Sequence, residues 1–195
     1  MSDKIKIINI LDQPPAYEEW GHKPRPALNW NTPDGSWVGI WGYDWPDQIG
    51  EQVLKQSDEF IYEVWQIDPR ADKIYTAVLP SGVIHKLFPA SKKYYFNGFK
   101  VGTDYFSDTL IHQIRRLTNS SIIHLNGGLD INLNRKILQL NKKKIILQFH
   151  GKIYIPVIEL ARINKNFLNV FRKIKLHFLY NKYGKIPKYI LYNNN

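Results

Sequence analysis

Short apolar runs alternate along the chain with amphipathic stretches, and this pattern predicts strands separated by helices. β-Branched apolar runs of roughly four to eight residues are typical of buried strands. We expect strands over residues 4–11, 60–66, 73–79, 83–88, 121–125, 144–149 and 188–192. Apolar residues at helical spacing predict helices over about 45–56, 103–117, 129–140 and 155–180.

Two local signals refine these elements. The segment Pro80-Ser81-Gly82 separates two strand-like runs and predicts a turn, so the flanking strands are expected to form an antiparallel hairpin. Thr103 or Asp104 is expected to cap the second helix, with Tyr105 on the apolar stripe of that helix.

This order of elements is typical of an α/β protein. Strands that alternate with helices form a parallel sheet covered by the helices. The chain has 195 residues, which one domain can accommodate. We therefore predict a single Rossmann-like domain over 1–195, with a central, mostly parallel sheet flanked by helices and with a hairpin insertion.

Composition excludes several classes of protein. The chain has no cysteine, so it has neither disulfides nor thiolate metal sites, and no metal site is expected. No apolar run reaches the roughly 18–20 residues that span a membrane, and the N-terminal residues do not resemble a signal peptide. A cytoplasmic protein is predicted.

The motifs GxxxxGK[ST] and GxGxxG are missing, which argues against a P-loop ATPase and a dinucleotide oxidoreductase.

The positive charge is concentrated in the last third of the chain. The net charge is +10, yet residues 1–134 carry 13 basic against 16 acidic residues, and residues 135–195 carry 14 against 1. This asymmetry suggests an anionic partner, which can be nucleic acid, anionic lipid or an acidic protein surface. A solvated basic face explains it equally well, and both interpretations stay open.

A long segment over 12–46 is rich in Pro, Gly and Trp and shows little periodicity. Five of the six tryptophans lie in it, including Trp37, Trp41 and Trp45. Aromatic faces stack on sugar rings and bases, and Asp44 in the same segment can bind hydroxyl groups. A loop whose tryptophans pack on one another is the alternative.

Two predicted strands end in histidine and glycine. One ends in His124-Leu125-Asn126-Gly127 and the other in His150-Gly151. In open α/β sheets the ligand lies at the carboxyl ends of the strands, where a histidine can bind a hydroxyl group or act as a base. Packed histidines with a purely structural role are the alternative.

These strand ends resemble those of a known family. The opening strand KIKIINIL, the run Ile122-Ile123-His124-Leu125-Asn126-Gly127 and the run ILQFHG that ends at His150-Gly151 are similar to the N-terminal, acceptor-side domain of GT-B glycosyltransferases of the family-4 type. The run KYILYN before the C-terminal asparagines resembles the strand that leads into the interdomain turn of that family.

The resemblance implies functions for the residues that match. His150 and His124 would be the catalytic residues, and His150 and Gly151 would face the cleft between domains, as would Gly39 and Gly42. Asn126 and Gly127 would line the acceptor side, together with Trp37, Trp41, Trp45 and Asp44 from the Trp-rich loop.

The resemblance also implies partners. A saccharide or a lipid-linked saccharide would be the acceptor. The nucleotide-sugar donor would bind a second domain, and this chain ends where that domain would begin. Either a partner chain supplies the donor domain in trans, or the chain is a truncated or repurposed product; no cofactor is expected on this chain. The basic stretch 162–185 would suit an anionic membrane surface, so a peripheral location at the membrane is compatible with the prediction.

Two alternatives remain open. The same fold can serve as a non-catalytic module that binds a carbohydrate or a protein. Nucleic-acid binding through the basic stretches is a third hypothesis, and the lack of an RNP, KH or zinc-finger signature in the sequence argues against it.

Overall fold

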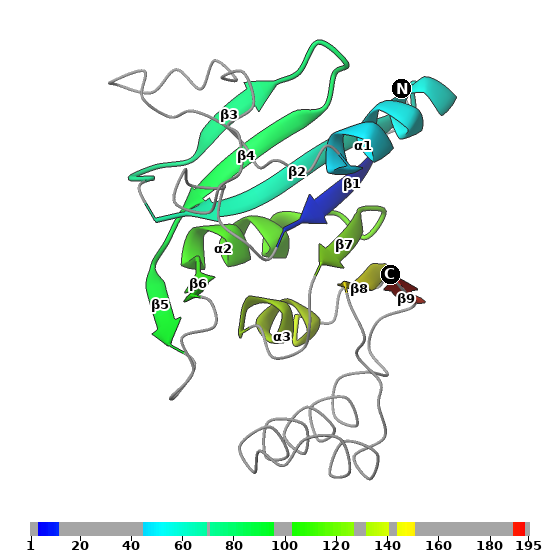
Figure 1. Cartoon of the computed structure of the whole chain (residues 1–195). Helices are drawn as coiled ribbons and strands as arrows, with labels where there is room; N and C mark the ends of the chain where they lie inside the picture. Colours follow the sequence, from blue (N-terminus) through cyan, green and yellow to red (C-terminus); the bar gives the residue numbers. More distant parts are fainter. Residues whose placement is uncertain are drawn as a thin grey trace, which may run out of the picture.

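A seven-stranded sheet is the centre of the molecule, which we describe from a computed structural model (Figure 1). The structure describes residues 4–11, 45–69, 71–95, 103–126, 132–140, 144–150 and 189–193. In space the strands follow the order β3-β4-β2-β1-β7-β8-β9. They are β1 (Ile5–Ile10), β2 (Phe60–Asp68), β3 (Tyr75–Val78), β4 (Ile84–Pro89), β7 (Ile122–Asn126), β8 (Ile145–His150) and β9 (Tyr189–Asn193).

All neighbouring strands of this sheet run parallel except β3, which is antiparallel to β4. Between β3 and β4 the amide of Gly82 donates to the carbonyl oxygen of Leu79 at 2.9 Å. Gly82 has a φ of 88°, a value that glycine adopts without steric strain. The prediction of an α/β protein with a mostly parallel sheet is therefore confirmed.

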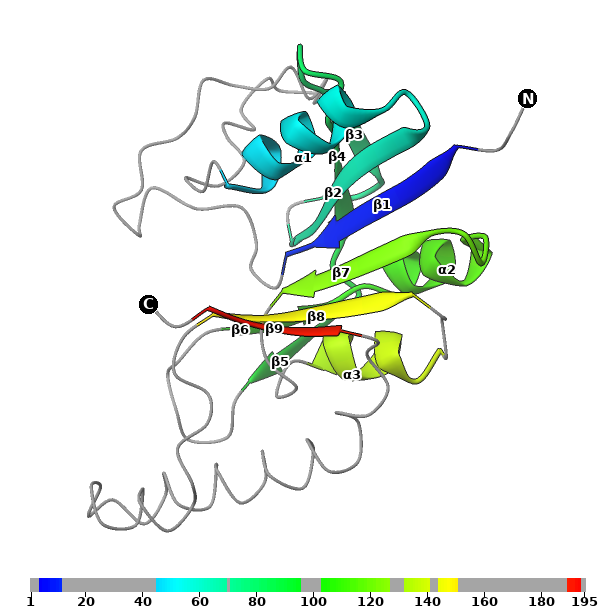
Figure 2. The ribbon, with the colours of Figure 1, turned by 90° about the vertical axis from the view of Figure 1, so that its right-hand side faces the viewer.

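Helices cover both faces of the sheet (Figure 2). Helix α1 (Trp45–Gln56) lies on one face, and α2 (Asp108–Arg116) and α3 (Asn132–Leu138) lie on the opposite face. A separate two-stranded antiparallel sheet is formed by β5 (Lys92–Tyr95) and β6 (Thr103–Phe106). None of the described helices combines the length and the apolar character needed to cross a membrane.

The alternation of side chains along the strands divides the core in two. Ile8 and Ile10 of β1, with Ile123 and Leu125 of β7, lie in the larger cluster, which contains residues of α2 and α3. A smaller cluster lies on the α1 side. It consists of Leu11, Tyr62, Val64 and Val83, with Ile7, Val53, Leu54 and Leu79 packed against it.

Two features bring α1 close to the sheet. Gly50 lies against the strands so tightly that an added Cβ would come within 2.6 Å of Tyr62 and 2.7 Å of Val83. In the first turn of the helix, the buried carboxylate of Asp47 lies 2.7 Å from Nε2 of His85 on β4. Since both groups are buried, this pair satisfies polar atoms that would otherwise be left unpaired between α1 and the sheet.

A charged cluster lies on the face of the sheet opposite α1. The buried carboxylate of Glu63 accepts from Nζ of Lys6 and Nζ of Lys86, each at 2.9 Å, and from Nε1 of Trp65 at 2.6 Å. Burial alone raises the pKa of the Glu63 carboxyl, but the bonds from Lys86 and Lys6 outweigh it and hold that pKa below its ordinary value.

The predicted N-terminus of the second helix is wrong. Thr103, Asp104 and Tyr105 lie in strand β6, and the N-cap of α2 is Ser107, whose Oγ accepts from the amide of Leu110 at 3.2 Å. Pairing with β5 explains the difference, because it takes residues 103–106 into a ladder that a helical pattern does not reveal. The helix expected over 155–180 lies outside the described residues.

Candidate functional site

A buried network of amide side chains lies where the carboxyl ends of β1 and β7 meet. Nδ2 of Asn126 donates to Oδ1 of Asn9 and, at 3.0 Å, to the carbonyl oxygen of Ile10. Nδ2 of Asn9 in turn donates to Oη of Tyr62 on β2 at 2.9 Å. The network therefore links three neighbouring strands on the face that α1 covers.

Strand alternation explains why these polar groups share one face. Ile8, Ile10, Ile123 and Leu125 point to the α2/α3 side, so the residues between and after them point to the other side. Asn9 is the register partner of His124, which places half-buried His124 beside Asn9 on the α1 side. The described part of this face is thus polar at the carboxyl ends of β1 and β7, while Ile10 and Leu125 make the opposite face apolar at the same edge.

The position of Asn126 is held from a second direction. Nδ2 of Asn134, in the first turn of α3, donates to the carbonyl oxygen of Asn126 at 3.0 Å. Both the side chain and the backbone of Asn126 are therefore bound by groups of the protein. A site with this support is rigid, which lowers the entropy lost when a ligand binds.

Gln66 on β2 lies on the same face and differs from Asn9 and Asn126 in its hydrogen bonding. Its side chain is 1% exposed, and neither its amide oxygen nor its amide nitrogen has a hydrogen-bond partner in the part of the chain that the structure describes. It follows Trp65, whose carbonyl oxygen accepts from the amide of Leu11 at 3.0 Å, so it lies beside the end of β1. A buried amide without partners indicates a missing hydrogen-bonding group, such as a water or a ligand.

The described carboxyl ends of β1, β7 and β8 contain no lysine, arginine or acidic residue, whereas β2 ends at the buried side chain of Asp68. Burial raises the pKa of Tyr62 to about 12, the bond from Asn9 lowers it by less, and the nearby charge of Asp47 raises it further. The phenol therefore stays protonated at physiological pH. Residues 8–11, 124–126 and 147–150 contain no lysine or arginine. Amides offer donors and acceptors together, which suits neutral hydroxyl groups better than phosphate.

Of the predicted site residues, His124 and Asn126 come together on β7, next to Asn9. His150 is the last residue of β8 and pairs in register with Asn193. Because His124 pairs with Ile146, His150 lies four residues further along the strand direction. At about 3.3 Å per residue, the two histidines are roughly 13 Å apart along the sheet.

Of the remaining predicted site residues, Trp45 is among the residues that the structure describes, and the others are not. Trp45 is the first residue of α1. Outside the described residues lie Trp37, Trp41, Asp44, Gly39, Gly42, Gly127 and Gly151.

Four residues at this edge of the sheet were not among the predicted site residues: Asn9, Tyr62 and Asn134 of the network, and the neighbouring Gln66. Asn9 and Gln66 are polar residues inside apolar runs that otherwise predict buried strands. An isolated amide in a buried strand was the available signal, because such a group must find a hydrogen-bond partner.

No cluster of three or more metal-ligating side chains occurs among the described residues. Comparison of the chain with known proteins found no matching family model, no matching curated protein and no matching solved structure. The site must therefore be interpreted from its own geometry.

Proposed function

We propose that the chain is a Rossmann-like, acceptor-side domain of a glycosyltransferase of the GT-B type. In chain order the parallel strands lie in space as 3-2-1-4-5-6, the order of dinucleotide-binding Rossmann sheets. In sheets of this order ligands bind outside the carboxyl ends of the strands, at the point where the order reverses. That point lies between β1 and β7, beside Asn9 and Asn126.

The observation that supports a saccharide ligand is the amide-rich face at this switch point. Sugar hydroxyls donate and accept hydrogen bonds, and the amide of Gln66 offers both functions without partners among the described residues. The opening strand also lacks a glycine-rich phosphate-binding turn. Both features favour a neutral, hydroxylated acceptor over a dinucleotide.

In the proposed reaction the acceptor hydroxyl oxygen forms a bond to the anomeric carbon of the donor sugar. The bond from that carbon to the nucleoside diphosphate breaks, and a histidine takes the hydroxyl proton. His124 is the base at the amide face, and His150 lies toward the interdomain cleft. We propose that the donor-binding domain lies outside these 195 residues and acts in trans.

The stagger of the two histidines favours a second candidate function. Since His124 and His150 differ by four residues along the strand direction, one hydroxyl group cannot bind both at this spacing. A non-catalytic carbohydrate-binding or protein-binding module on the same fold needs no second histidine and no donor domain.

Titration calorimetry against a panel of neutral oligosaccharides tests the binding step. We expect the wild-type chain to bind at least one glycan, and Gln66→Met to lose that binding. Gln52→Met makes the same exchange at an exposed position of α1 and should bind as the wild type does. A chain that binds no glycan, but captures a defined protein partner, contradicts the saccharide proposal and supports the protein-binding module.

Transfer assays separate the enzyme from the carbohydrate-binding module. The chain is mixed with nucleotide-sugar donors, with and without a second polypeptide that carries a donor-binding Rossmann-like domain. We expect transfer only with both polypeptides, and we expect His124→Ala to reduce transfer more than it reduces glycan binding. Rapid transfer by the isolated chain contradicts a donor domain in trans.

A further inference from the structure

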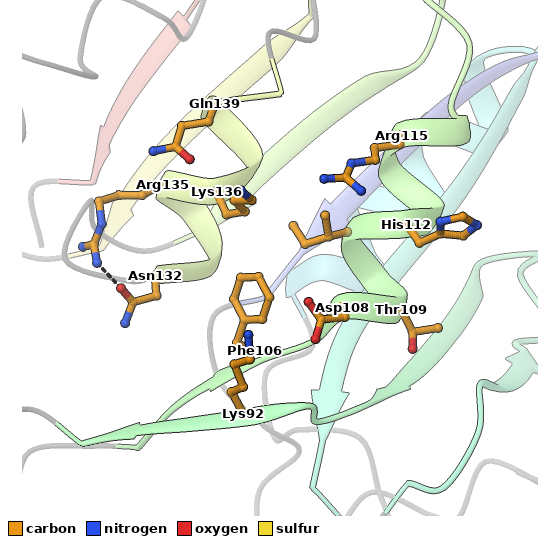
Figure 3. A pocket seen from close by; sticks show the side chains of 11 residues that line it. Lys92, Phe106, Asp108, Thr109, His112, Arg115, Asn132, Arg135, Lys136 and Gln139 are labelled. Carbon is orange, nitrogen blue, oxygen red and sulfur yellow. Dashed lines mark hydrogen bonds between the residues drawn. The ribbon is translucent and has the colours of Figure 1, made fainter.

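The structure assigns a second binding site, for the phosphate groups of a soluble phosphorylated small molecule, to a groove between α2 and α3. The groove has a volume of about 820 Å³, which lies within the range of small-molecule sites. Its apolar floor includes Phe106 of β6 and Ile111 of α2, and Lys92 of β5 lies at one end (Figure 3).

Helical periodicity explains how the polar side chains gather in this groove. On α2, Asp108, Ile111 and Arg115 follow the spacing that places residues on one side of a helix. On α3, Asn132 and Arg135 are three residues apart and Lys136 follows Asn132 by four. Figure 3 shows Arg115 extending from α2 toward the α3 side. The groove is therefore lined by matching polar stripes of two helices.

The charge of the lining is strongly unbalanced. Four cations line the groove, Lys92, Arg115, Arg135 and Lys136, against the single carboxylate of Asp108. Cations in the last turn of a helix interact favourably with its dipole, which accounts in part for Arg115, Arg135 and Lys136. It does not account for Lys92, which comes from a strand of the separate β5–β6 sheet. The convergence of three elements on one groove indicates an anionic ligand.

Two of these cations are already held in place. The guanidinium of Arg135 donates to Oδ1 of Asn132. Nζ of Lys92 lies 5.9 Å from the centre of the Phe106 ring, within cation–π distance. Side chains that are ordered before binding lose less conformational entropy when a ligand arrives. Both contacts therefore favour binding at this site.

The chemistry of the lining favours phosphate over other anions. Arg115, which extends from α2 toward the α3 side, presents a planar group that binds phosphate oxygens in pairs, and Lys92 and Lys136 add point charges (Figure 3). A groove of this volume takes a diphosphate or a sugar phosphate, whereas a nucleic acid needs a positive stripe that continues along its backbone. We therefore assign a small soluble ligand.

This groove is independent of the amide face. It lies on the α2/α3 side of the sheet, opposite α1 (Figure 2). Asn9, Tyr62 and Gln66 lie on the α1 side, because they alternate along their strands with residues of the larger cluster. A ligand in the groove can therefore bind whether or not the chain recognises a saccharide. Gln66→Met should leave phosphate binding unchanged, so the failure of one proposal is distinguishable from the failure of the other.

Titration calorimetry of the full chain with inorganic pyrophosphate at low ionic strength tests the assignment. We expect binding that weakens as salt is added. Arg115→Glu and Lys136→Glu should each weaken it by about tenfold or more, because each replaces an attractive charge by a repulsive one. Arg116→Glu is the matched control, since Arg116 is exposed on α2 and does not line the groove.

The assignment is contradicted if pyrophosphate does not bind, or if Arg116→Glu weakens binding as much as Arg115→Glu. Two comparators test the source of the phosphate: vesicles of phosphatidylglycerol and a single-stranded oligonucleotide. Binding of either one that is tighter than that of pyrophosphate, and lost in the groove variants, would assign the groove to a membrane or a nucleic acid and overturn the proposal. Circular dichroism confirms that each variant is folded.

Discussion

Asn126 and Asn9, which are 117 residues apart in sequence, are joined by a buried hydrogen bond between their side-chain amides. The bond crosses from β7 to β1, the two strands between which the strand order reverses. It therefore does two things. It satisfies polar groups inside the core, and it holds together the two halves of the sheet at the place where we propose that a ligand binds.

Removing either asparagine should destabilise the protein. We expect Asn9→Ala and Asn126→Ala each to lower the free energy of unfolding by about 1–3 kcal/mol, because each leaves buried partners unsatisfied. The double variant should lose less than the sum, with a coupling energy of about 0.5–3 kcal/mol. Urea unfolding followed by circular dichroism measures all three. Asn119→Ala, at an exposed turn position, is the control and should change stability little. Strictly additive losses would show that the bond has no energetic role.

Gln66 should behave in the opposite way. Gln66→Met keeps a similar shape and removes two buried polar atoms that have no partner among the described residues. We expect the free energy of unfolding to rise by about 1–2 kcal/mol, while glycan binding is lost. Gln52→Met at the surface of α1 should change neither. A stability loss in Gln66→Met, measured by urea unfolding, would indicate that Gln66 has structural partners instead of a ligand-binding role.

The strands of the seven-stranded sheet and α1 could be predicted because their signals are local. β1 lies within the predicted run, β2 begins at Phe60 as expected, and α1 ends at Gln56 as expected. The spacing of apolar residues predicts which side chains are buried, and the period of that spacing distinguishes a helix from a strand. The same logic predicted that His124 and Asn126 lie at the carboxyl edge, because parallel strands bring their carboxyl ends to one side of the sheet.

What could not be predicted depends on pairing between distant segments. The β5–β6 ladder pairs Lys92 with Phe106. It contains residues 103–106, which the apolar spacing assigns to the start of the second helix. The stagger of His124 and His150 follows from the register of β7 on β8, which periodicity does not determine. The hydrogen-bond partner of Asn9 is also distant in sequence. A polar residue in a buried strand therefore predicts a hydrogen bond, but it does not identify the partner.

The close contact of α1 with the sheet gives a test of packing. In an unhindered helix, Gly→Ala stabilises by about 1 kcal/mol. At Gly50 the new Cβ would meet Tyr62 at 2.6 Å and Val83 at 2.7 Å, and overpacking of this kind costs about 1–3 kcal/mol. We expect Gly50→Ala to lower the free energy of unfolding, and we expect the loss to be smaller when it is measured in a Val83→Ala background. Gln52→Ala is the control. A more stable Gly50→Ala protein would contradict the observed packing of α1.

The Glu63 cluster predicts how stability depends on acid. The pKa of the Glu63 carboxyl is held below its ordinary value of 4.5, because the bonds from Lys86 and Lys6 outweigh the effect of burial. A carboxyl with a lowered folded-state pKa stabilises the protein above its unfolded-state pKa, and this contribution is lost as pH falls through the folded-state value. The wild type should therefore lose stability below about pH 4.5, the ordinary value of the group.

Glu63→Gln isolates this contribution. At pH 7 we expect the variant to be less stable by about 1–3 kcal/mol, because Lys6 and Lys86 lose a charged acceptor. As pH falls below 4.5 the difference from the wild type should shrink, since the wild-type carboxyl then becomes neutral as well. Urea unfolding at a series of pH values between 3 and 7 measures the difference. Glu59→Gln, at an exposed position next to β2, is the control. If the difference stays constant across this range, the carboxyl of Glu63 does not titrate as the cluster requires, and the two lysines do not stabilise its charge.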